Sequence, residues 1–135
     1  MPDIRTVTDT FSVAPQLAPG ELAEAARLGF VKVINNRPDG EAPDQPASAV
    51  MQAAARAAGL DYAHIPVRGM PTADQVEAMT DAVEAADGPV LAFCRSGTRS
   101  ITIWSLGQAQ AGERSRQDLI GLGAAAGYDL SGALG

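Results

Sequence analysis

The chain has 135 residues, a formal net charge of −6 at pH 7 and an apolar fraction of 46%, so we expect one domain, residues 1–135, with one hydrophobic core. The acidic charge argues against a general affinity for nucleic acid. One cysteine and one histidine exclude an internal disulfide and argue against a structural zinc site, and we expect neither a metal nor a cofactor.

The beginning of the chain lacks the apolar segment of a secretory signal peptide. No run of residues approaches the ~20 apolar residues that span a bilayer. We therefore expect a cytoplasmic protein that does not bind membranes.

Strand and helix signals alternate from residue 11 onward. We expect a short strand over residues 11–14 and a helix over 18–28, because proline and glycine stand at suitable ends of that helix. A β-branched strand follows over 30–34. Residues 35–45 are rich in Asn, Pro, Gly and Asp, as a loop requires.

The second half of the chain continues this alternation. The expected elements are a helix over 46–58, a strand over 62–67, a helix over 72–86, a strand over 89–93, and helices over 100–111 and 115–126. Thr72 and Gln75 match a capping box, and Trp104 has the helical spacing of a core residue. The pattern predicts a three-layer α/β domain with a central, mostly parallel sheet flanked by helices.

The strand at 89–93 leads directly into the only cysteine, Cys94, and a short loop that ends at Arg99. The predicted anion-binding loop consists of Arg95, Ser96, Gly97, Thr98 and Ser100. Its backbone N–H groups and the following helix N-terminus would surround one anion and favour the thiolate form of Cys94. The Arg99 guanidinium suits an oxyanion, and Arg95 adds positive potential. We therefore predict Cys94 and Arg99 as catalytic residues.

This loop resembles those of two enzyme families with a cysteine nucleophile. Cysteine-dependent phosphatases have the pattern C-x5-R, and rhodanese-type sulfurtransferases have a loop one residue shorter. Cys94 and Arg99 are separated by four residues, so the spacing favours sulfur transfer.

Other segments extend the resemblance. They cover residues 13–22, residues 33–41 with an Asn-x-Arg-Pro-Asp pattern, and residues 62–67 with an Ile-Pro-Val pattern. Together with 94–100 they resemble the β-lactamase hydrolase-like protein, phosphatase-like domain family over about residues 10–110. The resemblance implies a cysteine phosphatase-like fold of the dual-specificity type. Members of that family have been called both phosphatases and sulfur transferases, so the fold does not decide the reaction.

A phosphatase of this type normally has a general acid, an aspartate, on the loop after the Ile-Pro-Val strand. Asp74 is better explained as an acid in the first turn of a helix, and Asp39 is equally well explained by turn chemistry. Sulfur transfer needs no such acid, because sulfite or a thiolate leaves as a stable anion. The sequence therefore favours a rhodanese-type sulfurtransferase that carries a persulfide on Cys94, in sulfide or persulfide metabolism.

Two alternatives stay open: a cysteine-dependent phosphatase of the tyrosine or dual-specificity type, and a module that senses an anion or a persulfide. Arg37 and Arg68 follow strands and are further candidates for the cleft, although a solvent-facing position, or for Arg37 a pairing with Asp39, explains each equally well. His64 is best explained as a packed or hydrogen-bonded strand histidine. The expected partners are a small sulfur donor, thiosulfate or a low-molecular-weight persulfide, with a thiol acceptor, or a protein persulfide.

Overall fold

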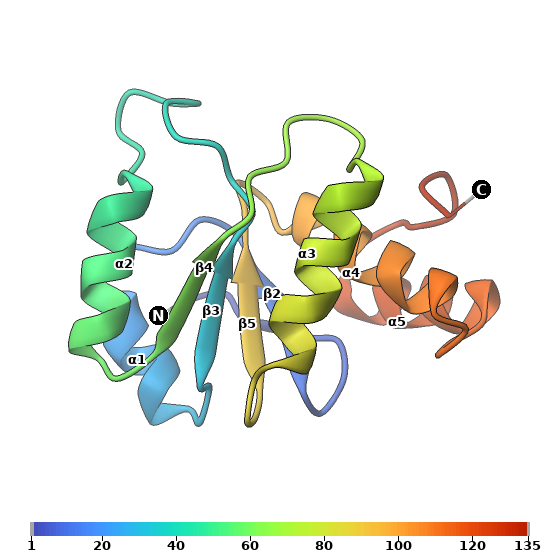
Figure 1. Ribbon diagram of the computed structural model, residues 1–135, viewed down its shortest axis with the longest axis horizontal. Helices are drawn as coiled ribbons and strands as arrows, with labels where there is room; N and C mark the ends of the chain where they lie inside the picture. Colours follow the sequence, from blue (N-terminus) through green and yellow to red (C-terminus); the bar gives the residue numbers. More distant parts are fainter. Residues whose placement is uncertain (1, 135) are drawn as a thin grey trace.

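A twisted, mostly parallel sheet forms the centre of the molecule (Figure 1). In this computed structural model, which describes residues 2–134, the sheet has five strands in the order β1-β2-β5-β3-β4. Their bounds are β1 Arg5–Thr6, β2 Phe11–Ala14, β3 Lys32–Asn35, β4 Asp61–His64 and β5 Val90–Phe93. Four strands are parallel, and β1 pairs antiparallel with β2 at one edge. The three-layer α/β fold expected from the sequence is confirmed.

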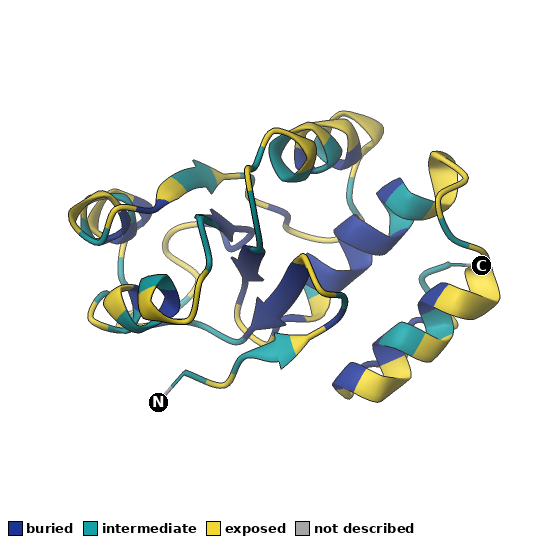
Figure 2. Cartoon of the chain, turned by 90° about the horizontal axis from the view of Figure 1, so that it is seen from below, coloured by how far each residue is buried: buried dark blue, intermediate teal, exposed yellow. Residues whose placement is uncertain are grey.

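Helices cover both faces of this sheet (Figure 1). Their bounds are α1 Glu21–Arg27, α2 Ser48–Ala57, α3 Ala73–Glu84, α4 Thr98–Gln110 and α5 Arg116–Ala126. Adjacent strand residues serve opposite faces: Val33 packs in one apolar cluster with α1 and α2, whereas Ile34 packs in the other with α3, α4 and α5. Side chains alternate across a strand, so β3 and β5 are buried on both sides, as the dark central strands in Figure 2 show.

Local signals explain most of the helix boundaries. Thr72 caps α3 through the expected reciprocal bonds with Gln75, at 3.2 and 2.9 Å. The first helix begins at Glu21 rather than residue 18, because the Glu21 carboxylate turns back to accept a hydrogen bond from the Ala18 N–H. The fourth helix begins two residues earlier than expected, because Gly97 ends the preceding loop in a left-handed conformation at φ 93°.

Trp104 is a core residue, as its spacing predicts. Its ring stacks on Phe11 with centroids 4.8 Å apart, and the residue is buried. Within residues 2–134, no helix is long and apolar enough to cross a membrane.

The strand register places the candidate nucleophile at the middle of the sheet's carboxyl edge. Phe93 lies opposite Ala14 of β2 and opposite Asn35 of β3. Cys94 therefore emerges between the loop after β2 and the loop after β3. In a parallel sheet, loops of this edge converge on one place.

Candidate active site

Cys94 lies at the base of the loop between β5 and α4. The backbone N–H of Gly97 donates to Cys94 Sγ at 3.1 Å, so the loop folds around the sulfur as the sequence predicts. Cys94 is 0% exposed. A substrate must therefore displace the atoms that cover the sulfur before it can reach it.

The loop hydroxyls have partners inside the protein. Ser96 Oγ donates to Thr98 Oγ1 at 3.0 Å and accepts a bond from the Thr98 N–H. Ser100 is fully buried and directs its hydroxyl proton to Asn36 Oδ1 at 2.8 Å. This hydroxyl ties α4 to the loop after β3, and the assignment of Ser100 to the anion-binding loop stays a prediction. The backbone N–H groups of the loop lie at the positive end of α4, where an anion would be favoured.

Arg99 presents a fixed guanidinium beside the sulfur. One of its Nη1 hydrogens goes to the Val67 carbonyl at 2.8 Å, and the other goes to Glu41 Oε2 at 2.8 Å. One Nη2 hydrogen goes to Glu41 Oε1 at 2.9 Å. A guanidinium has five N–H donors, so the Nε–H and the second Nη2–H remain. These two lie along one side of the group and match two oxygens of a tetrahedral anion.

Two neighbouring groups, Glu41 and Cys94, influence the pKa of Arg99. Hydrogen bonding to Glu41 raises the pKa of Arg99 most, burial opposes this rise, and interaction with the Cys94 sulfur adds to it. The Arg99 guanidinium is therefore close enough to Cys94 to interact with a thiolate.

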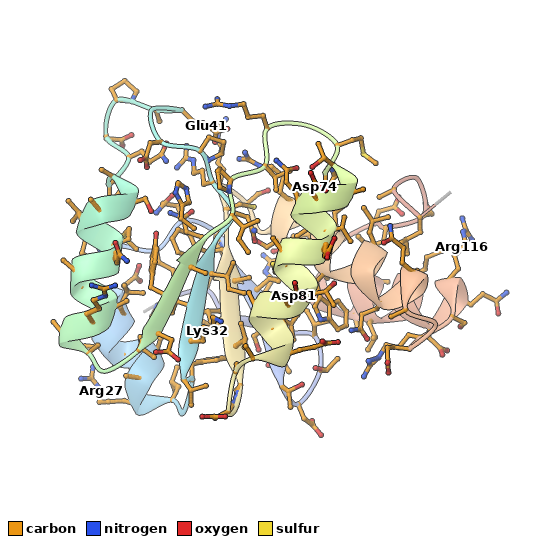
Figure 3. The ribbon with its side chains drawn as sticks, viewed as in Figure 1. Arg27, Lys32, Glu41, Asp74, Asp81 and Arg116 are labelled. Carbon is orange, nitrogen blue, oxygen red and sulfur yellow. The ribbon has the colours of Figure 1, made fainter. Side chains whose placement is uncertain are left out.

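Glu41 joins the two arginines of the site. Besides Arg99, it accepts a bond from Arg37 Nε at 3.0 Å, and Arg37 Nη1 donates to Gln16 Oε1 at 3.0 Å. The hydrogen bonds from Arg99 lower the pKa of Glu41 most, to about 2, although burial acts in the opposite direction. Gln45 holds the loop by accepting from the Glu41 N–H. Figure 3 shows Glu41 above the carboxyl edge of the sheet.

Glu41 should stabilise the fold in a pH-dependent way. Its folded-state pKa lies below the ordinary 4.5, so its contribution is complete above 4.5 and is lost as the pH falls toward about 2. We expect Glu41→Gln to lower the free energy of unfolding at pH 7 by on the order of 1 kcal/mol, and the deficit to shrink on acidification. Urea unfolding of both proteins at several pH values between 7 and about 2 measures this difference in the free energy of unfolding. Glu77→Gln, on an exposed position of α3, is the matched control; a deficit that does not change with pH would contradict this role.

The two predicted acid candidates do not reach the sulfur through any described contact. Asp39 Oδ1 accepts the Ser48 N–H at 2.8 Å and so caps α2. Asp74 is exposed in the first turn of α3, where Figure 3 shows it on the outside of the helix. Both positions agree with structural rather than acid-base roles.

The remaining candidates divide between the site and its surroundings. Arg37 is buried and belongs to the site; it neither faces solvent nor pairs with Asp39. Arg95 is exposed, and its backbone carbonyl accepts from the Gln16 N–H. Arg68 and His64, together with Asp39, line a cavity of about 460 Å³ between the loops after β3 and β4. His64 is exposed, and its Nε2 is bonded to the Arg37 carbonyl at 2.9 Å, so it is a hydrogen-bonded rather than a packed strand histidine.

Sequence reasoning missed three side chains that shape the site: Gln16, Asn36 and Glu41. All three lie inside the segments that carry the family resemblance, residues 13–22 and 33–41. The signal was therefore present in the resemblance, but the composition of these loops indicated only turns.

Known proteins similar to this chain include both sequence relatives and solved structures. The chain is 38% identical over 129 residues to a beta-lactamase hydrolase-like protein of Agrobacterium fabrum, which covers 94% of this chain and 30% of the relative. It is 37% identical over 129 residues to a protein of the same name from Xylella fastidiosa, with 95% and 30% covered. The chain thus spans less than a third of the length of these curated relatives.

Solved structures share the whole fold. A Neisseria meningitidis protein named a "putative phosphatase" matches with a TM-score of 0.86 and 31% identity, over 97% of this chain and 93% of that one. Tk-PTP in its active form matches with a TM-score of 0.74 and 20% identity, over 97% and 90%; at that identity the match shows the fold alone. The expected cysteine phosphatase-like fold is confirmed.

A family model supplies the assignment. The model of the beta-lactamase hydrolase-like protein, phosphatase-like domain, matches residues 3–111, which include every strand and both catalytic candidates, Cys94 and Arg99. The chain therefore belongs to the beta-lactamase hydrolase-like protein, phosphatase-like domain family.

Proposed function

We propose that this chain is a cysteine-dependent phosphatase that acts on phosphate monoesters. The observation that carries the proposal is the hydrogen bond from the Gly97 N–H to Cys94 Sγ at 3.1 Å, five residues before an Arg99 guanidinium held in place by Glu41 and the Val67 carbonyl. The similarity to a Neisseria meningitidis structure named for this activity supports it. The ranking from the sequence alone, with sulfur transfer first, is thereby reversed, because the comparisons favour the phosphatase alternative.

The reaction would proceed in two displacements. The Cys94 thiolate attacks phosphorus, an S–P bond forms, and the P–O bond to the alcohol breaks, with its electron pair leaving on the alkoxide. Water then attacks the phosphocysteine, the S–P bond breaks, and the thiolate and inorganic phosphate are released. The two remaining donors of Arg99 would hold two equatorial oxygens through both steps.

The carboxylates of Asp39 and Glu41 are both occupied by structural contacts, and this limits which phosphate esters the site can hydrolyse. Asp39 caps a helix, and Glu41 is held ionised by two arginines, so neither is placed to protonate a departing alkoxide. An alcohol that leaves without protonation departs fastest when it forms a stable anion. Aryl phosphates are therefore the preferred substrate class.

A second candidate function is sulfur transfer, and the same lack of a placed acid favours it together with the four-residue spacing from Cys94 to Arg99. The thiolate would attack the outer sulfur of thiosulfate, the S–S bond would break, and sulfite would leave with the electron pair. The resulting persulfide on Cys94 would pass its outer sulfur to an acceptor thiolate. The short loop would stabilise the terminal sulfur anion.

A comparison on one preparation separates the two functions. We expect kcat/KM for an aryl phosphate to exceed that for thiosulfate and for glutathione persulfide, and Cys94→Ser to abolish it. A higher kcat/KM for either sulfur donor would make sulfur transfer the function instead. Binding of these anions without turnover would overturn both proposals in favour of a sensing module.

A further inference from the structure

Tyr128 reaches the nucleophile loop from a part of the chain outside the family match at 3–111. It follows α5, where Gly127 adopts a left-handed conformation at φ 94° and the Tyr128 N–H bonds to the Gly123 carbonyl at 2.8 Å. This turn sends the chain back toward α4, and Tyr128 joins the apolar cluster that also contains residues of α3, α4 and α5. Figure 1 shows α5 and the chain end beside α4.

The Tyr128 hydroxyl contacts one peptide group of the loop. It donates to the Ser96 carbonyl at 2.9 Å. The N–H of that same peptide group is the Gly97 N–H, which donates to Cys94 Sγ at 3.1 Å. In a planar trans peptide the carbonyl and the N–H point in opposite directions. Holding the carbonyl on Tyr128 therefore aims the N–H at the sulfur.

We propose that Tyr128 is a positioning residue that fixes the Ser96–Gly97 peptide so that its N–H stabilises the Cys94 thiolate. The inference rests on the proposed function only in taking Cys94 as the reacting group. Under this inference, the segment after α5 contributes to the reactivity of the site.

The loop needs such an anchor because of its own glycine. Gly97 can adopt many backbone conformations, so its peptide rotates easily unless it is tethered. A Cβ at Gly97 would lie 2.2 Å from the Tyr128 oxygen, which shows how closely the ring approaches the loop. Glycine thus permits both the left-handed turn and the contact.

Tyr128 is itself held in place. The Arg5 guanidinium lies over its ring, 5.3 Å from the centroid, and Arg5 Nη1 bonds to the Ala126 carbonyl at 3.2 Å. Burial raises the pKa of Tyr128 most; Arg5 lowers it, and the charges of Cys94 and Asp3 raise it. The hydroxyl therefore stays protonated near neutral pH and can act as the donor.

The test is Tyr128→Phe, which keeps the ring and removes only the donor. The chain has a single cysteine, so protein labelled with ¹³C at the cysteine β-carbon gives one NMR signal whose pH titration reports the thiol directly, without substrate. We expect the titration midpoint to move up by about one pH unit, the size expected for losing one hydrogen bond to a charged group. The Gly97 amide resonance, which should follow this titration in the unmodified protein, should lose much of its response.

Tyr62→Phe is the matched control, since Tyr62 is the other tyrosine and also has a hydrogen-bonded hydroxyl, shared with Ser48 and Asn35. It should leave the Cys94 midpoint unchanged even if it lowers the melting temperature. An unchanged midpoint and an unchanged Gly97 response in Tyr128→Phe would overturn the inference. Because the titration needs no turnover, that failure is distinct from a failure to hydrolyse phosphate esters.

Discussion

Arg99→Lys is expected to lower kcat/KM for an aryl phosphate by about 10²–10³, the usual effect of removing a donor aimed at transition-state charge. Lysine keeps the positive charge but is a point charge without the planar fork. It cannot bond the Val67 carbonyl, both oxygens of Glu41 and the substrate together, as Arg99 is arranged to do. Steady-state kinetics on the two proteins measure the loss.

The matched control for this substitution is Arg56→Lys on an exposed position of α2. It changes the same functional group far from Cys94, so its kcat/KM should equal that of the unmodified protein. If Arg99→Lys also retained full kcat/KM, the Nε–H and the second Nη2–H of Arg99 would not bind the substrate, which would contradict the proposed role of Arg99.

Local signals were sufficient for most of the fold. The apolar run before Cys94, the capping box at Thr72 and the core spacing of Trp104 each depend on residues close in sequence, and each is confirmed. The two-residue strand β1 was missed because alternation cannot be recognised over so short a stretch. Two helices begin at other residues than predicted. The start of α1 is determined by the Glu21 side chain, which bonds to the Ala18 N–H, and the start of α4 by Gly97, which ends the loop before it.

The site was predictable only in its centre. Cys94, Gly97 and Arg99 lie within six consecutive residues, between the end of β5 and the first turn of α4, so their spacing revealed their relation. The contacts that orient them cross the chain: Glu41 is 58 residues from Arg99, and Tyr128 is 32 residues from Ser96. Glu41 lies in a loop whose composition suggests only turns, and Tyr128 follows a helix that ends unremarkably at a glycine. A single sequence contains no pattern that pairs two residues so far apart in the chain.

The ranking of the two reactions from the sequence is not the one that the comparisons favour. The four-residue spacing and the lack of an acid after β4 favoured sulfur transfer, whereas the family and the solved structures favour a phosphatase. The two reactions share a nucleophile and an anion-binding loop, and they differ in what is bound there. Activity measurements with both substrate classes therefore decide between the two reactions.

Intact mass spectrometry after rapid quenching tests most directly whether Cys94 is the nucleophile. Phosphoryl transfer from an aryl phosphate to Cys94 should be faster than hydrolysis of the phosphocysteine, because the aryl leaving group departs as a stable anion. We predict that the protein gains the mass of one phosphoryl group, that peptide mapping places it on Cys94, and that Cys94→Ser gains nothing. A gain of one sulfur atom from thiosulfate, removed by a thiol, with none from the phosphate ester would keep Cys94 as nucleophile but assign it to sulfur transfer. No adduct on Cys94 from either compound would contradict the account.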